Sequence, residues 1–153
     1  MSMIKALSAL AAMFLIAACS NNDTQTASAA STTVTPGSVG DFRQNVGDRV
    51  FFDTDRSNIR ADQRATLERQ SAWMGRFPQV QVMVEGHADE RGTREYNLAL
   101  GQRRANAARD VLVAGGVAPA RISTISYGKD RPAALGSNEQ AWSQNRRAVT
   151  VVR

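Results

Sequence analysis

The sequence has little of what metal centres, disulfides and most cofactor enzymes require. It contains one histidine and one cysteine in 153 residues. A zinc finger, an internal disulfide or a 2-His-1-carboxylate iron centre needs two such residues, so the chain cannot form any of them by itself. The Gly-x-Ser-x-Gly, Gly-x-Gly-x-x-Gly and P-loop patterns are also absent, which excludes the enzyme classes that depend on them. We therefore expect no metal and no cofactor.

The remaining composition is that of one globular domain with an excess of positive charge. Hydrophobic residues make up 42% of the chain and charged residues 22%, which fits neither a disordered chain nor a polytopic membrane protein. Lysine and arginine number 19 against 14 acidic residues, for a net charge of +5. This balance favours a nucleic acid, an anionic surface or an acidic polymer as partner.

The N-terminus has the layout of a signal peptide. Residues 6–18 form an uninterrupted run of small and apolar residues that ends directly before Cys19, and polar residues follow. A membrane-spanning helix needs about 20 apolar residues, so this run is too short. We predict that residues 1–18 are removed. The alternative is a buried N-terminal helix with an incidental cysteine, which would show a polar stripe.

The segment Ile16-Ala17-Ala18-Cys19 resembles a bacterial lipobox. This resemblance implies that Cys19 carries an S-diacylglycerol group and an N-acyl chain such as palmitate, and two or more acyl chains anchor a protein stably. Ser20 resembles the sorting signal of lipoproteins sent to the outer membrane of a Gram-negative cell. We expect a lipid-anchored protein on the periplasmic face of that membrane.

Residues 19–41 are predicted to be the lipidated cysteine and a flexible linker, and residues 42–153 to be the domain. The linker is rich in small polar residues and has too few large apolar ones to form a core. Hydrophobic patterns in the domain predict four strands and three helices: strands at 49–53, 80–84, 122–127 and 147–152, helices at 62–77, 94–114 and 139–145. This order predicts an α/β sandwich with helices on one small sheet, and leaves the strand pairing open.

One face of the predicted 94–114 helix stands out by its spacing. Residues at i, i+3, i+7, i+10 and i+14 are small or apolar: Leu98, Gly101, Ala105, Ala108 and Leu112. Such spacing places side chains on one side of a helix, so we expect this face to be buried.

Four blocks of sequence carry a specific family resemblance. They are residues 84–97 (Val-Glu-Gly-His-Ala-Asp-Glu-Arg-Gly-Thr-Arg-Glu-Tyr-Asn), 100–105 (Leu-Gly-Gln-Arg-Arg-Ala), 126–129 (Ser-Tyr-Gly-Lys) and 141–149 (Ala-Trp-Ser-Gln-Asn-Arg-Arg-Ala-Val). In this order they resemble the peptidoglycan-associated lipoproteins, within the OmpA-like C-terminal domain family. The resemblance covers residues 50–152. It implies an OmpA-like domain, with helices packed on a small mixed four-stranded sheet.

The resemblance also implies a ligand and a pocket. The ligand is the meso-diaminopimelate of non-crosslinked peptidoglycan stem peptides, whose free end carries an ammonium and a carboxylate on one carbon. Asp89 and Arg104 match the family's binding pair, with Asp89 receiving the ammonium and Arg104 forking onto the carboxylate. Without the resemblance, the same two residues would be interpreted as an ordinary ion pair between a loop and a helix.

Four further residues are assigned to this pocket. Asn97 lies two helical turns before Arg104 on the same face, so it is expected to line the pocket or to brace the loop. By resemblance, the backbone after the first predicted strand closes the opposite side, at Thr54, Asp55 and Arg56. Their N–H groups are expected to hold the carboxylate, and the Asp55 side chain to sense the ammonium.

An enzyme is an alternative with weaker support. Ser126 and Lys129 match the Ser-x-x-Lys pattern of penicillin-binding enzymes, and Ser143 with Asn145 their Ser-x-Asn pattern. That chemistry needs the first serine at the start of a helix, whereas Ser126 lies near the end of a predicted strand, and no Lys-Thr-Gly element exists. We predict that the chain is not an enzyme.

Four other residues have expected roles outside the ligand-binding set. His87 is interpreted as a hydrogen-bonded structural residue rather than a catalytic base. Trp142 is expected to pack the last helix onto the sheet. Arg146 and Arg147 are candidates for a partner surface.

Together these features predict a tether between the outer membrane and the cell wall. By resemblance, the partners are peptidoglycan, TolB and other components of the Tol-Pal system, which acts in envelope integrity and cell division. The alternatives are an OmpA-like envelope lipoprotein without TolB binding, a polyanion-binding domain and a wall-modifying enzyme. Because export separates the chain from nucleic acid, we expect no nucleic-acid partner.

Overall fold

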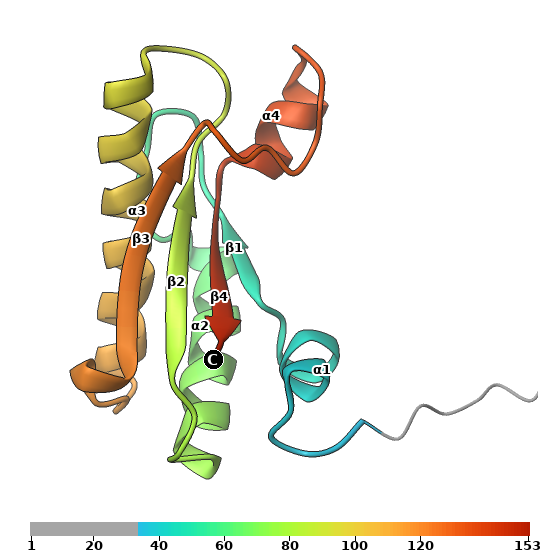
Figure 1. Cartoon of the computed structure of the whole chain (residues 1–153), viewed down its shortest axis with the longest axis vertical. Helices are drawn as coiled ribbons and strands as arrows, with labels where there is room; N and C mark the ends of the chain where they lie inside the picture. The colour runs from blue at the N-terminus through green and yellow to red at the C-terminus, as the bar shows by residue number, and fades with distance from the viewer. Residues whose placement is uncertain (1–33) are drawn as a thin grey trace, which may run out of the picture. The chain divides into compact units, whose positions relative to one another are not determined.

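The structure, a computed structural model, describes residues 34–153 (Figure 1). The predicted signal peptide, Cys19 and the linker as far as residue 33 lie outside the described residues. The elements are, in order, α1 (Val39–Asp41), the π-helical turn η1 (Phe42–Val46), β1 (Arg49–Phe51), α2 (Ala61–Arg76), β2 (Val82–His87), α3 (Arg94–Ala114), the 3₁₀ turn η2 (Pro119–Arg121), β3 (Ile122–Gly128), α4 (Glu139–Asn145) and β4 (Arg147–Val152). None of the helices in residues 34–153 is long and apolar enough to span a bilayer.

The four strands form one mixed sheet, and two helices cover one of its faces. The strand order is β1-β4-β2-β3; β4 is antiparallel to both of its neighbours, and β2 is parallel to β3. Helices α2 and α3 lie behind the sheet in Figure 1, and α4 lies at the end of the sheet where β4 begins. The predicted α/β architecture is confirmed, and the strand order adds what the hydrophobic pattern left open.

Most predicted elements are present, some with shifted ends. Helices α3 and α4 and strand β4 have the predicted bounds, and α2 begins and ends one residue earlier. Strand β2 runs on to His87, because Gly86 still pairs with Ser126 and Ala148 on the two neighbouring strands. The loop after β2 therefore begins later than the pattern indicated.

The folded part of the chain begins before residue 42, where the prediction placed its start. The Ser38 hydroxyl accepts a hydrogen bond from the Asp41 backbone N–H at 3.1 Å and caps α1. Oδ2 of Asp41 accepts hydrogen bonds from Nε1 of Trp73 at 2.8 Å and from the Gly37 N–H at 2.9 Å. A buried indole N–H needs an acceptor, and the predicted linker supplies it. The end of the predicted linker is therefore part of the fold.

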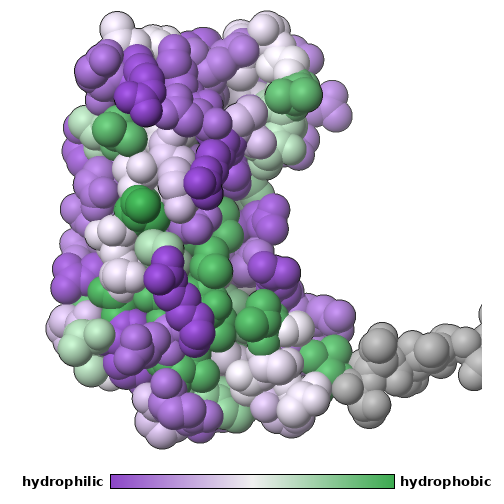
Figure 2. Space-filling view, in the orientation of Figure 1, coloured by the Kyte–Doolittle hydropathy of each residue, from purple (hydrophilic) through white to green (hydrophobic). Residues whose placement is uncertain are grey.

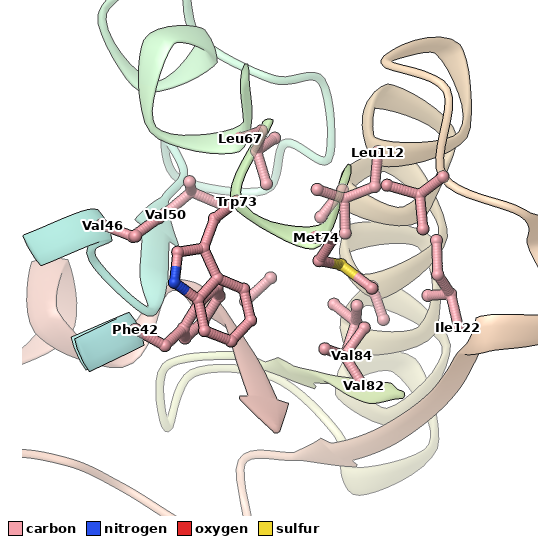
Figure 3. Close-up of a cluster of buried hydrophobic side chains, with 14 of the residues drawn as sticks. Phe42, Val46, Val50, Leu67, Trp73, Met74, Val82, Val84, Leu112 and Ile122 are labelled. Atoms are coloured by element: carbon pink, nitrogen blue, oxygen red, sulfur yellow. The ribbon is translucent and has the colours of Figure 1, made fainter. Parts of the chain in front are cut away.

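The hydrophobic core lies between the sheet and helices α2 and α3 (Figure 3). At its centre Trp73 is 1% exposed and packs between Phe42 and Phe77, with ring centroids 4.9 Å from each. Such tilted aromatic pairs stabilise a core beyond the area that they bury. The labelled side chains around it are Val46, Val50, Leu67, Met74, Val82, Val84, Leu112 and Ile122.

The buried face of α3 differs from the predicted one in its first half. Four of the five predicted residues are buried, namely Gly101, Ala105, Ala108 and Leu112. The fifth, Leu98, is 39% exposed, and the inward positions of the first turns belong to Asn97, Leu100 and Arg104. The prediction was wrong here because it counted only apolar and small residues, while two of the inward side chains are polar.

Strand β2 and helix α3 touch each other through two glycines. A Cβ atom on Gly86 would overlap the carbonyl oxygen of Gly101. Any side chain at this point would push the helix away from the sheet. The close approach brings the loop after β2 next to the first half of α3, where the candidate site lies.

The second face of the sheet carries no helix within the described residues. Figure 2 shows this face, with hydrophobic residues over the strands and hydrophilic ones around them. Met83, Val149 and Val151 alternate with core residues along β2 and β4, so they point to this side, where they are half-buried. The second face is therefore mixed, since Glu85 lies opposite Val149 on it, and its apolar part accounts for the valines at 149 and 151 of β4.

Candidate ligand-binding site

A cavity of about 240 Å³ lies at the end of the sheet where β2 finishes. The loop after β1, the loop after β2 and the first half of α3 line it. The lining residues are Thr54, Asp55, Asp89, Arg91, Gly92, Tyr96, Asn97, Leu100 and Arg104. Five of the six predicted pocket residues thus come together from three distant parts of the chain, and Arg56 is the one left out.

Asp89 is a buried carboxylate flanked by two arginines. Arg91 forks onto it, with Nη2 at 2.7 Å from Oδ2 and Nε at 3.1 Å from Oδ1. The Arg91 backbone N–H also donates to Oδ1 at 3.1 Å, and Nη1 of Arg146 lies 3.5 Å from Oδ2. Within residues 34–153 Asp89 makes no ion pair with Arg104, so the ordinary ion pair considered from the sequence is not formed.

These surroundings keep Asp89 ionised. Burial by itself raises the pKa of the carboxyl, but the hydrogen bonds and the charge of Arg91 outweigh it, and Arg146 adds to them. The pKa of Asp89 therefore lies below its ordinary value of 3.8. At neutral pH Asp89 therefore carries a full negative charge on the wall of the cavity.

The two arginines on Asp89 are held to different degrees. The Arg146 side chain is 7% exposed; its Nε donates to the Phe52 carbonyl at 3.0 Å, and its Nη2 bonds Glu139. The Arg91 side chain is 40% exposed, and its guanidinium lies 4.1 Å from the centre of the Trp142 ring. Arg146 is buried and held by other groups, whereas Arg91 lines the cavity and is partly exposed.

The Arg104 side chain is fully buried and binds backbone carbonyl groups. It is 0% exposed and donates to three backbone carbonyls, at 2.8 Å to Arg56, 2.9 Å to His87 and 3.1 Å to Asp53. Burial lowers the pKa of this guanidinium to about 10, so it stays charged at neutral pH. Three of its five N–H donors hold the loop after β1 to the end of β2, and the other two make no hydrogen bond among the described residues.

The loop after β1 closes the opposite wall with two of its three predicted residues. Within the described chain the backbone N–H groups of Thr54 and Asp55 donate to no protein group, whereas that of Arg56 donates to the Asp53 carbonyl at 3.2 Å. Asp55 has a left-handed backbone with φ of 58°, and the Tyr96 hydroxyl donates to its carboxylate. The prediction that the Arg56 N–H faces the ligand is wrong, because the turn uses it.

Asn97 braces the loop that carries Asp89. It is 2% exposed and donates to the carbonyls of Arg91 at 2.8 Å and Thr93 at 3.0 Å. The Thr93 hydroxyl in turn caps α3 by accepting from the Tyr96 N–H at 3.2 Å. Asn97 thus has both roles considered from the sequence, since it also borders the cavity.

Two expectations about the last helix are wrong. Trp142 does not pack α4 onto the sheet; its Nε1 donates to Glu90 at 3.0 Å and its ring lies under Arg91, both in the loop after β2. Arg146 and Arg147 are buried, 6% and 7% exposed, and do not form a partner surface. Buried arginines of this kind also mean that the excess positive charge is not all at the surface.

The residues that suggested catalysis are not arranged for it. His87 is 2% exposed, and neither of its ring nitrogens has a hydrogen-bond partner among residues 34–153, which differs from the hydrogen-bonded role expected. Burial first, and then the charges of Arg147 and Arg131, lower the pKa of His87 to about 4. Ser126 lies inside β3 and accepts from the Gly128 N–H at 3.1 Å, not at the start of a helix.

Three residues of the site were missed from the sequence: Arg91, Tyr96 and Arg146. Arg91 follows Asp89 by two residues, a spacing at which an arginine can fork onto a carboxylate in a loop, so a local signal existed. Tyr96 meets Asp55 and Arg146 meets Asp89 only through the fold, across 41 and 57 positions of the chain. No pattern in the sequence predicts pairs of residues that lie so far apart in the chain.

Comparison with known proteins agrees with this architecture. The OmpA family model matches residues 51–146. The chain is 56% identical over 149 residues to the peptidoglycan-associated lipoprotein of Mesorhizobium japonicum, covering 94% of this chain and 89% of that one. The chain belongs to the peptidoglycan-associated lipoproteins of the OmpA family. The relative in Agrobacterium fabrum is 62% identical over 118 residues, covering 77% of this chain and 67% of that one.

Two solved structures share the fold. The crystal structure of the peptidoglycan-associated lipoprotein from Burkholderia pseudomallei has a TM-score of 0.68 and 42% identity, covering 69% of this chain and 90% of that one. The C-terminal domain of Helicobacter pylori MotB has a TM-score of 0.65 and 25% identity, covering 69% and 84%. The lipoproteins are thus the nearer of these two groups in sequence.

Proposed function

We propose that this chain binds peptidoglycan non-covalently through the free end of meso-diaminopimelate, without altering it chemically. The observation that carries the proposal is the buried, ionised Asp89 on the wall of a cavity that Arg104 also borders. A free diaminopimelate end carries an ammonium and a carboxylate on one carbon, so its site needs an anion and hydrogen-bond donors a few ångströms apart. The name of the relatives, peptidoglycan-associated lipoprotein, supports the same ligand class.

The size of the cavity fits the end of one amino acid. A volume of about 240 Å³ holds roughly eight water molecules at about 30 Å³ each. The charged end of diaminopimelate is of this size, while the rest of the stem peptide and the glycan strand would stay outside.

Each charge of the ligand has a proposed partner. Asp89 receives the ammonium, and hydrogen bonds between charged groups of this kind contribute about 1.5–3 kcal/mol each. The carboxylate takes the two remaining donors of Arg104 and the unused N–H groups of Thr54 and Asp55. Asn97 acts indirectly, by holding the loop that positions Asp89.

The envelope location and the partners beyond peptidoglycan rest on the sequence and on family resemblance. We propose that Cys19 carries acyl chains that hold the protein in the outer membrane, and that the domain joins this membrane to the wall. We further propose that TolB, as part of the Tol-Pal system, binds the domain in competition with peptidoglycan. Incorporation of labelled palmitate that Cys19→Ser abolishes would test the anchor. Capture of TolB that the stem peptide reduces would test the competition.

Sedimentation with purified diaminopimelate-type peptidoglycan tests the proposed function. We expect the full-length wild-type chain in detergent to pellet with the wall material, and Asp89→Asn to stay mostly in solution, for a loss of about 1.5–3 kcal/mol. Asp130→Asn is the matched control, because Asp130 pairs with Arg94 at 2.8 Å outside the cavity. Lysine-type peptidoglycan, which lacks the carboxylate next to the side-chain ammonium, is the ligand control.

Equal pelleting of wild type and Asp89→Asn, with circular dichroism showing both folded, would reject the proposed site. Binding to any polyanion, RNA included, with no effect of Asp89→Asn would favour the polyanion alternative.

A further inference from the structure

We infer that the guanidinium of Arg91 competes with the ammonium of the ligand for Asp89. Binding at Asp89 is then an exchange of one cation for another. This inference rests on the proposed function and adds a residue that sets the affinity of the same site. It follows from the number of acceptor positions on Asp89, from the exposure of Arg91 and from the groups around its guanidinium.

Arg91 takes three of the roughly four acceptor positions on the Asp89 carboxylate. Each oxygen of a carboxylate accepts about two hydrogen bonds. Oδ1 accepts from the backbone N–H and from Nε of Arg91, both at 3.1 Å. Oδ2 accepts from Nη2 of Arg91 at 2.7 Å and has Nη1 of Arg146 at 3.5 Å. An incoming ammonium can therefore make more than one hydrogen bond to Asp89 only by displacing a donor of Arg91.

The side chain of Arg91 is the donor that can leave. Arg146 is held by the Phe52 carbonyl and by Glu139 and is 7% exposed. The backbone N–H of Arg91 is fixed by the loop, which Asn97 holds through the Arg91 carbonyl at 2.8 Å. The guanidinium of Arg91 is 40% exposed, and its only other hydrogen bond among the described residues is a long one to Thr54, at 3.4 Å.

A second place for the guanidinium lies next to the first. Arg91 stacks on Trp142 at 4.1 Å, and Trp142 is anchored through its Nε1 to Glu90 at 3.0 Å. The carboxylates of Glu139 and Glu90 both stabilise the charge of Arg91. The guanidinium can therefore leave Asp89 and remain over the indole ring, between other anions, at little cost. When it leaves, two acceptor positions open toward the cavity.

The exchange predicts which change of sequence strengthens binding. A ligand with a free ammonium displaces Arg91 to make more than one hydrogen bond to Asp89, so removal of the guanidinium should strengthen its binding. A ligand whose amine is acetylated brings no cation. Without Arg91, the carboxylate of this ligand would lie near an Asp89 whose negative charge is less neutralised. Arg91→Met should thus affect the two ligands differently, which a merely structural role of Arg91 would not do.

Calorimetric titration of the full-length chain in detergent tests this. The probes are the tripeptide L-Ala-γ-D-Glu-meso-diaminopimelate and the same peptide acetylated at the free amine of diaminopimelate. We expect Arg91→Met to bind the free-amine peptide about fivefold more tightly than wild type does, which corresponds to about 1 kcal/mol. Binding of the acetylated peptide should stay the same or weaken. Arg91→Lys, which restores the charge, should bind the free-amine peptide more like wild type.

The control is Arg94→Met, which removes an arginine of the same segment whose ion pair with Asp130 lies outside the cavity. It should change neither titration. If Arg91→Met is folded and binds the free-amine peptide as wild type does or more weakly, the inference is overturned, while the proposed function stands. If wild type binds neither peptide, or does not distinguish them, the proposed function itself fails.

Discussion

The core behind the sheet and the cavity at its end are held together by different forces. Between the sheet and helices α2 and α3, apolar side chains pack around Trp73 (Figure 3). At the cavity end, arginines donate to backbone carbonyls: Arg104 to three, Arg146 to that of Phe52, and Arg147 to those of Asn145 and Arg131. The first region is stabilised by apolar burial, and the second holds three loops in a fixed arrangement through hydrogen bonds.

The difference explains how a small domain can hold a charged site. Apolar packing alone would leave no donors or acceptors for a zwitterionic ligand. Guanidinium groups fix several carbonyls at once and keep charge in the wall of the cavity, at the cost of burying that charge. The cavity end is therefore the part of the fold that depends most on individual polar residues.

The largest expected effect on the free energy of unfolding comes from removing the hydrogen bonds that Arg104 donates to three carbonyls. Arg104→Met should lower the free energy of unfolding by about 3–5 kcal/mol, because three carbonyls, partly or fully buried, lose their donor. Arg121 is the matched comparison: it also donates to three carbonyls, at Val80, Met74 and Phe77, but is only half-buried. Water can replace it there, so Arg121→Met should cost about 1 kcal/mol. Urea unfolding of both variants at pH 7 measures the difference, and equal losses would contradict it.

The next effect comes from the buried imidazole of His87. Its pKa is lowered to about 4 in the fold, against about 6.5 in the unfolded chain, so the unfolded chain binds the proton first as the pH falls. This group should remove about 2–3 kcal/mol of stability between pH 7 and 4.5, and the loss from it should level off about one pH unit below the folded pKa of about 4. Wild type and His87→Phe, unfolded in urea at both pH values, should differ by this amount in their acid sensitivity. The same acid sensitivity in both chains would show that His87 is not the cause.

The smallest effect is expected where charge is at the surface. The Arg94 side chain is 65% exposed and pairs with Asp130, which is 41% exposed. Exposed pairs of this kind contribute about 0–1 kcal/mol, so Arg94→Met should change the free energy of unfolding by less than about 0.5 kcal/mol. A loss as large as that of Arg104→Met would mean that burial does not determine the worth of these arginines.

The contrast between the two regions also explains what could be predicted from the sequence. Periodic apolar residues indicated α2, α3 and the strands, because the core is apolar. The inward face of α3 was wrong at Leu98, since Asn97 and Arg104 occupy core positions that a hydrophobic pattern does not recognise. Asp89 and Arg104 were assigned to the pocket by family resemblance and Asn97 by its helical spacing to Arg104, and the structure places all three at one cavity. The hydrogen bonds from Arg104 to three carbonyls and the pairing of Asp89 with Arg146 depend on tertiary contacts, so residue spacing could not predict them.

The most direct test of the central claim, recognition of an ammonium by Asp89, changes protein and ligand together. Wild type and Asp89→Asn would each be titrated with the free-amine tripeptide and with the acetylated tripeptide. We predict that acetylation weakens binding to wild type by about 1.5–3 kcal/mol, and weakens binding to Asp89→Asn far less. The same loss on acetylation in both chains would show that the ammonium is recognised elsewhere and would contradict the account.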